Sequence, residues 1–155
     1  MYKLGGLHTK LNELFCNAYY PNRELSIDEQ MVGTRCRVGF IQYMPKKPTK
    51  FGIKIWTLAE ACTGYCLQFQ IYTGKSDDGQ ENGLAYRVVT DLLSSQFLHK
   101  NHHVYFDNYF TTVALVQDLA KNATYTCVTI RSDRGKFPMS FTSKGALERG
   151  KSLFR

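Results

Sequence analysis

Apolar residues recur along the chain with two different periods, and their succession predicts an α/β fold. Five runs rich in β-branched and aromatic residues, each bounded by turn signals, are expected to be strands. These runs are Leu25 to Val32, Phe51 to Ala61, Tyr65 to Thr73, His103 to Phe106 and Thr124 to Arg131. Thr63-Gly64, between the second and third runs, predicts a tight turn, so these two strands should form an antiparallel hairpin.

Helical spacing of apolar residues predicts three helices before and between these strands. They cover Leu4 to Tyr19, Leu84 to Leu98 and Thr112 to Lys121. Because the second helix crosses over the sheet before the strand at His103, that strand should run parallel to an earlier one. Three meandering strands followed by helix, strand, helix and strand predict a ribonuclease-H-like fold, with a mixed five-stranded sheet and flanking helices.

The length and composition of the chain fit one compact domain. With 155 residues, of which 43% are hydrophobic and 14% aromatic, the chain can bury a substantial core and is not disordered. We expect a helical lead-in over residues 1–22, the ribonuclease-H-like core over residues 23–139 and a basic tail over residues 140–155. No run approaches the roughly 18 apolar residues of a membrane span, so we expect a soluble, intracellular protein without membrane contact.

The charge of the chain favours polyanions, and nucleic acid above all, as partners. The formal net charge is +7 and the sequence pI is near 9.2. Charge alone is weak support, because many soluble proteins are this basic without binding DNA; the alternative for the basic loop from Lys46 to Lys54 is a solvated face. Five aromatic residues of the predicted strands and links are expected in the core rather than as platforms for stacked bases. They are Phe40, Tyr43, Trp56, Phe69 and Tyr72.

The cysteine content indicates a reducing compartment. Five cysteines spread over a chain of this size do not resemble a secreted disulfide scaffold. Cys62 and Cys66, with His99, His102 and His103, could in principle form a zinc site, but their spacing does not match paired CxxC motifs. We therefore expect buried structural cysteines and surface histidines.

Two aspartates, Asp28 and Asp107, lie inside apolar, β-prone runs, where we expect the carboxylates to be buried. A buried carboxylate needs a cation, a helix N-terminus or a hydrogen-bond cluster. In the predicted fold their strands are neighbours, so the two side chains can converge although they are far apart in the sequence. Carboxylate oxygens suit Mg²⁺, which suggests a shared metal. The alternative is that each caps a helix or a turn, which Asp107, shortly before the helix at Thr112, could do.

A series of motifs around these aspartates resembles the piggyBac transposases and the domesticated piggyBac-derived proteins of animal genomes. The matching segments run from Leu25 to Met31, from Tyr43 to Lys54, from Tyr72 to Gly74, from Phe106 to Thr112 and from Thr129 to Arg134. The ordered series covers most of residues 1–139 and is far more specific than any one motif.

The resemblance implies a transposase catalytic core of the three-aspartate type, which acts in the nucleus and cuts and joins DNA at transposon ends with Mg²⁺ or Mn²⁺. Asp28 would be the first catalytic aspartate and metal ligand, and Asp107 the second. The resemblance also places a set of basic residues against the DNA backbone, where cations give sequence-independent affinity. This set is Arg35, Arg37, Lys46, Lys47, Lys50 and Lys54.

The third aspartate of the family has no recognisable counterpart in the chain. Glu148, the only acidic residue after Asp133, lacks the family's third motif. We interpret the chain as a truncated member whose fold is incomplete at the C-terminal end, with weak catalysis or none by itself. A homodimer or a full-length transposase-family partner could supply the missing aspartate. A non-catalytic DNA-binding or protein-interaction remnant stays open, and a ribonuclease acting on RNA–DNA hybrids is a third, less favoured reading.

Overall fold

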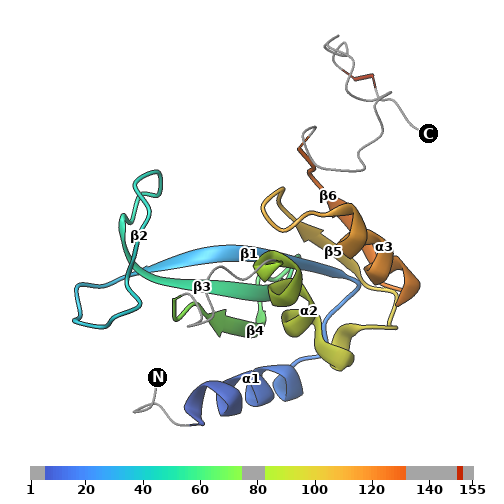
Figure 1. The fold of residues 1–155 in the computed structure, drawn as a ribbon. Helices are drawn as coiled ribbons and strands as arrows, with labels where there is room; N and C mark the ends of the chain where they lie inside the picture. The colour runs from blue at the N-terminus through green and yellow to red at the C-terminus, as the bar shows by residue number, and fades with distance from the viewer. Residues whose placement is uncertain (1–5, 75–82, 132–149, 152–155) are drawn as a thin grey trace.

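One helix and a run of strands are followed by alternating helices and strands (Figure 1) in the chain, for which a computed structural model describes residues 6–74, 83–131 and 150–151. The elements in order are α1 (Leu7–Ala18), β1 (Glu24–Gly33), β2 (Gln42–Tyr43), β3 (Phe51–Glu60), β4 (Cys66–Ile71), α2 (Leu84–Phe97), β5 (His103–Phe106), α3 (Val113–Lys121) and β6 (Tyr125–Val128). The segment 75–82, Glu148 and most of the predicted basic tail lie outside the described residues.

The strands form one mixed sheet with the order β2-β3-β1-β5-β6, in which β4 also pairs with β3. β3 runs antiparallel to β1 and β4, whereas β5 runs parallel to both β1 and β6. The predicted α/β, ribonuclease-H-like class is confirmed, as are the hairpin and the parallel strand after the crossover helix. At the hairpin, Gly64 has a positive φ of 72°, which glycine adopts without strain.

Within the described residues the sheet has six strands rather than the five predicted from sequence. The additional strand, β2, contains only Gln42 and Tyr43, which pair with Gly52 and Phe51 of β3. Two residues are too few to show a period of two, so the hydrophobic pattern could not identify this strand. It makes the segment before Pro45 part of the sheet rather than a link.

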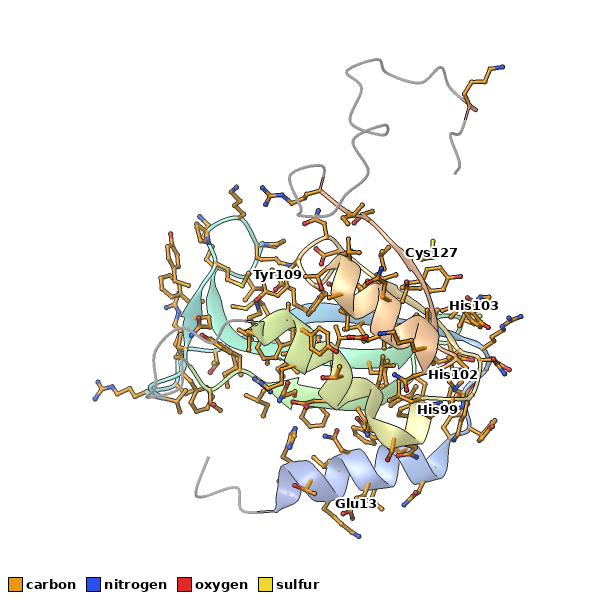
Figure 2. The ribbon with its side chains drawn as sticks, turned by 45° about the vertical axis from the view of Figure 1, so that its right-hand side comes forward. Glu13, His99, His102, His103, Tyr109 and Cys127 are labelled. Carbon is orange, nitrogen blue, oxygen red and sulfur yellow. The ribbon has the colours of Figure 1, made fainter. Side chains whose placement is uncertain are left out.

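One face of the sheet carries the hydrophobic core, and α2 and α3 cover it (Figure 2). Leu25 and Ile27 of β1 lie in this core together with Val104 and Phe106 of β5. The helices contribute a further set of buried side chains, which are Val88, Val89, Leu92, Leu93 and Phe97 from α2 and Leu115 and Leu119 from α3. Since neighbouring strand residues point to opposite faces, the intervening positions of β1 and β5 face away from α2 and α3.

The helix α1 packs beside β4 (Figure 1), and part of its apolar surface stays exposed. None of its residues is fully buried, and Leu7 and Leu14 are 52% and 51% exposed. Instead, His8, Asn12 and Cys16, spaced four residues apart, form polar contacts with the backbone of β4. This stripe covers the hydrogen-bonding edge of β4, which is the outer strand on that side.

No helix in the described part of the chain combines the length and apolar character that a membrane crossing requires.

Candidate functional site

Asp28 and Asp107 lie where the pairing of β1 with β5 ends. The last paired residues of the parallel strands β1 and β5 are Ile27 and Phe106, and each is followed directly by one of the two aspartates. The helix α2 and the strand β5 thus return the chain to β1 and bring together two carboxylates that are distant in sequence. The predicted adjacency of their strands is confirmed.

The two aspartates line a common open hollow of about 460 Å³ at this end of the sheet. Three neighbouring parallel strands each contribute three consecutive residues to its lining. These are Ser26, Ile27 and Asp28 in β1, Tyr105, Phe106 and Asp107 at the end of β5, and Cys127, Val128 and Thr129 at the end of β6. Because Ile27 points into the core, Asp28, the next residue of β1, lies on the face opposite α2 and α3. Asp107 follows directly after the end of β5 and lines the same hollow. The hollow is therefore open to a large ligand.

Both carboxylates are exposed, so the premise that they are buried is wrong. Asp28 is one position out of phase with the buried Leu25 and Ile27, and Asp107 lies beyond the end of β5. Asp28 Oδ1 accepts a hydrogen bond from the backbone N–H of Glu29 at 2.7 Å, and Asp107 Oδ1 accepts one from Tyr109 at 3.0 Å. The second bond has the form of a turn cap, as the alternative interpretation predicted.

The local hydrogen bonds are compatible with a cation at the same side chains. An ionised carboxylate has two oxygens and about four acceptor positions, so one bond to each Oδ1 leaves most of that capacity unused. Mg²⁺ binds to one or two carboxylates, keeps several waters and takes phosphate oxygens as further ligands. Asp28 and Asp107 therefore fit part of a magnesium site. Among the described residues no group of three His, Cys, Asp or Glu side chains is placed to hold a metal.

A lysine that is largely buried lies behind this pair of aspartates. Lys54 Nζ is 2.7 Å from Glu29 Oε2, and its side chain is only 12% exposed. The same ammonium lies 5.2 Å from the ring centroid of Trp56 and 4.9 Å from that of Tyr109. Tyr109 comes from the segment after β5 (Figure 2), so Lys54 connects β1 with the segment that carries Asp107. Sequence reasoning missed this role, because it depends on the register of β1 against β3.

The predicted DNA-contacting residues fall into two groups. Arg35, Arg37, Lys46 and Lys50 are exposed. Lys47 and Lys54 both pair with Glu29, at 3.2 and 2.7 Å. Burial raises the pKa of Glu29, but these two lysines more than offset this and hold it below its ordinary value. Among the described residues no acid forms an ion pair with the exposed group, whereas Lys47 and Lys54 are partly neutralised by Glu29. Contact of all six with DNA stays a prediction.

Glu24 organises the side chains next to the hollow. Its Oε2 accepts a hydrogen bond of 2.5 Å from the hydroxyl of Tyr105, and its Oε1 lies 3.3 Å from His103 Nδ1. The bond to Glu24 raises the pKa of Tyr105, since a neighbouring carboxylate disfavours a phenolate. Tyr105 thus stays a neutral hydroxyl at the edge of the hollow.

The histidines and cysteines are arranged differently from the expectation. His102 is buried, His99 is exposed and His103 is half-buried (Figure 2). Burial lowers the pKa of His102, which contacts the backbone carbonyl of Arg23 at 3.3 Å. None of the five cysteines is buried, and all are free thiols. The prediction of buried structural cysteines is therefore wrong, because Cys36 lies in the link after β1, Cys62 in the turn after β3 and Cys127 on the open face of the sheet.

Comparison with known proteins agrees with the arrangement of the sheet. A family model described as Transposase IS4 matches residues 1–155. The chain belongs to this transposase family. The resemblance to piggyBac transposases is likewise confirmed, by two human proteins and by a solved structure.

The relatives are much longer than this transposase-family chain. PiggyBac transposable element-derived protein 3 of Homo sapiens is 35% identical over 136 residues, which are 84% of this chain and 23% of that protein. The Chimeric ERCC6-PGBD3 protein of Homo sapiens is also 35% identical over 136 residues, but these make up 13% of its length. The cryo-EM structure of a piggyBac transposase synaptic complex with hairpin DNA matches with a TM-score of 0.81 and 25% identity, over 96% of this chain and 30% of that one.

Proposed function

We propose that this chain is a piggyBac-type transposase domain that binds DNA and contributes two metal-binding aspartates to DNA cutting and strand transfer. The observation that carries the proposal is the position of Asp28 and Asp107, which directly follow paired residues of β1 and β5 and line one hollow. The similarity to a transposase solved with hairpin DNA supports DNA as the ligand.

In this proposal the aspartates bind and orient the metal. Bonds from the backbone N–H groups of Glu29 and Tyr109 hold each Oδ1, which fixes the orientation of both carboxylates before a ligand arrives. Bound Mg²⁺ or Mn²⁺ would activate a water or a 3′-hydroxyl and stabilise the leaving oxygen of a phosphodiester. The aspartates would also keep the metal on the open face of the sheet, where a DNA strand can approach.

The exposed cations supply the DNA affinity in this proposal. Arg35, Arg37, Lys46 and Lys50 present positive charge near the β2–β3 end of the sheet, and Lys47 and Lys54 also lie on that side. Phosphate contacts of this kind release counterions, so binding should weaken steeply as salt is raised. Such contacts position the duplex without reading its sequence.

Nicking of a supercoiled plasmid in Mg²⁺ or Mn²⁺ tests the catalytic part of the proposal. We expect at most weak, metal-dependent nicking by the chain alone, and loss of that nicking in Asp28→Asn and in Asp107→Asn. Asp91→Asn is the matched control, because Asp91 is an exposed acid on α2 paired with Arg87. Nicking that survives in both aspartate variants, or that falls equally in Asp91→Asn, would disprove the assignment of these carboxylates.

A second candidate is a DNA-binding domain without catalysis, in which the aspartates act only as local caps. It is favoured by the hydrogen bonds that both side chains already make, and by the lack of a three-ligand group in the described residues. Its signature is salt-sensitive plasmid binding that is unchanged by Mg²⁺ and by Asp28→Asn, with no nicking by any variant.

The proposal includes a nuclear location and a protein partner. A homodimer or a longer transposase-family protein would add the ligand that Asp28 and Asp107 lack. Tyr105 and Tyr125, which are 38% and 48% exposed on β5 and β6, offer apolar surface for such a contact. Sedimentation at several concentrations, with and without DNA, tests the homodimer; a single monomeric species throughout would contradict it.

A further inference from the structure

Two large aromatic side chains are exposed where β2 meets β3. Tyr43 and Phe51 are register partners, and their rings stack with 4.6 Å between centroids and 30° between planes. Tyr43 is 58% exposed and Phe51 is 55% exposed. The expectation that Tyr43 belongs to the core is therefore wrong. A cross-strand pair supports a short hairpin, but support of the hairpin does not require that both rings stay largely in water.

The aromatic pair lies between basic surfaces. Phe51 lines one open hollow of about 560 Å³ together with Arg35 and Lys50. Tyr43 lines another of about 540 Å³ together with Lys46 and Lys47. Each ring thus has two cations beside it.

The acid in the second hollow does not cancel this charge. Glu29 also lines that hollow, but it is paired with Lys47 and Lys54. Lys46 therefore keeps its charge on the Tyr43 side, and Arg35 and Lys50 keep theirs on the Phe51 side.

We infer that the Tyr43–Phe51 pair is a stacking platform for unpaired bases of a DNA strand whose phosphates contact Lys46, Lys50 and Arg35. Aromatic faces beside cations match the two chemical features of a single strand, which are exposed base faces and backbone charge. A duplex offers the charge but hides its base faces within the stack, so it would use the cations alone. The inference rests on the proposed DNA binding and adds a preference for unpaired bases.

The test compares a thymidine homopolymer with a blunt duplex of mixed sequence, by fluorescence anisotropy at fixed salt. We expect Tyr43→Ala and Phe51→Ala each to weaken single-strand binding roughly tenfold, with a much smaller effect on the duplex. Tyr43→Phe should bind like the wild type because it keeps the ring. Tyr20→Ala is the control, since Tyr20 is 81% exposed and lies beyond α1, away from β2.

A second readout separates stacking from support of the hairpin. A 2-aminopurine base in the single strand should be quenched on binding to the wild type and to Tyr43→Phe, and should stay bright with Tyr43→Leu. Tyr43→Leu keeps apolar bulk in β2, so it remains informative where Tyr43→Ala unfolds. Thermal unfolding of every variant checks that the fold is kept.

The outcomes distinguish this inference from the proposed function. Two results would overturn the platform while leaving DNA binding intact. One is an equal loss of single-strand and duplex affinity in Tyr43→Ala and Phe51→Ala. The other is an unchanged single-strand affinity in these variants together with a bright probe in all complexes. Failure of the wild type to bind either DNA would overturn both. If the aromatic pair instead mediates self-association, sedimentation without DNA should show a dimer of the wild type that is lost in Tyr43→Ala. This result would also contradict the platform.

Discussion

Lys54 and Glu29, on the neighbouring strands β3 and β1, form an ion pair with 2.7 Å between Nζ and Oε2. Glu29 directly follows Asp28, and the N–H of Tyr109, whose ring lies 4.9 Å from Lys54 Nζ, donates to Asp107. One ammonium therefore contacts the residue directly after Asp28 and the residue whose N–H donates to Asp107. Lys54 itself does not line the hollow of the two aspartates.

Lys54→Met should destabilise the fold, because Glu29 would lose its closest cation while its side chain is only 19% exposed. We expect the free energy of unfolding in urea to fall by about 1–3 kcal/mol, with Lys47 limiting the loss. The double variant Lys54→Met, Glu29→Leu should recover part of it, since no unpaired carboxylate remains.

The control for this prediction is Lys121→Met. Lys121 pairs with Asp118 at 2.8 Å, but both side chains are well exposed, at 75% and 42%. Exposed pairs contribute little, so this variant should unfold almost like the wild type. A Lys54→Met variant that is no less stable than Lys121→Met would show that the buried pair has no such role.

Glu60 makes stability depend on acid pH. Its side chain is 0% exposed and accepts hydrogen bonds from Asn22 Nδ2 at 2.6 Å, from Thr63 N at 3.0 Å and from the Thr63 hydroxyl. The Thr63 hydroxyl contributes most to a pKa lowered to about 2, and burial opposes the shift. These bonds tie the segment before β1 to the β3–β4 hairpin.

A carboxyl with a lowered pKa in the folded state stabilises the fold above its unfolded pKa, and this contribution is lost as pH falls through the folded value. The free energy of unfolding should therefore decrease as the pH falls from the ordinary pKa of 4.5 to the folded-state pKa of about 2. Glu60→Gln should be less stable at neutral pH, because its NH₂ group faces donors, and its stability should change less over this interval. Urea unfolding at a series of pH values gives both curves, and parallel curves would refute the role of Glu60.

Much of the sheet followed from the sequence, because burial in β1 alternates with a period of two. Leu25 and Ile27 are buried and Asp28 is exposed, and the crossover through α2 requires a parallel β5. The adjacency of the aspartate-bearing strands could be predicted for the same reasons. The same alternation shows why the expected burial of Asp28 was wrong, since it is out of phase with its apolar neighbours.

The remaining features depend on contacts that a local pattern does not contain. The pairing of Lys54 with Glu29 follows from the register of β1 against β3. The exposure of Tyr43 follows from its place in β2, a strand of only two residues that the sequence pattern does not reveal. The polar packing of α1 is a further feature of this kind. The spacing of Leu7 and Leu14 predicts only a helix, whereas β4 presents an unpaired backbone edge, whose donors and acceptors polar side chains of α1 satisfy.

Asn12 is expected to hold α1 against that edge. Its amide donates to Phe69 O at 2.9 Å and accepts from Phe69 N at 3.0 Å, as a neighbouring strand would. Asn12→Ala should lower the free energy of unfolding by about 1–2 kcal/mol and speed hydrogen exchange at the Phe69 amide. Asn17→Ala, at an exposed position of the same helix, is the control. Unchanged exchange at Phe69 in Asn12→Ala would show that α1 does not protect β4.

Gly52 sets how closely β3 can approach β1 at the base of the β2–β3 hairpin. A Cβ atom at this position would lie 2.3 Å from Val32 O and 2.9 Å from Val32 C, and both are backbone atoms that no rotamer change can move. Gly52→Ala should therefore force the strands apart where Val32 pairs with Ile53, and should lower the free energy of unfolding by about 1–3 kcal/mol.

The control for Gly52→Ala is Gly39→Ala, because a Cβ at Gly39 meets no atom within 4 Å. The free energy of unfolding of this variant should equal that of the wild type or slightly exceed it, since alanine restricts the unfolded chain. Separation of the strands at Gly52 would also displace Phe51 and its partner Tyr43, so Gly52→Ala should weaken single-strand binding together with stability. If Gly52→Ala is as stable as Gly39→Ala, β1 and β3 do not meet as closely as the register of Gly33 with Gly52 requires.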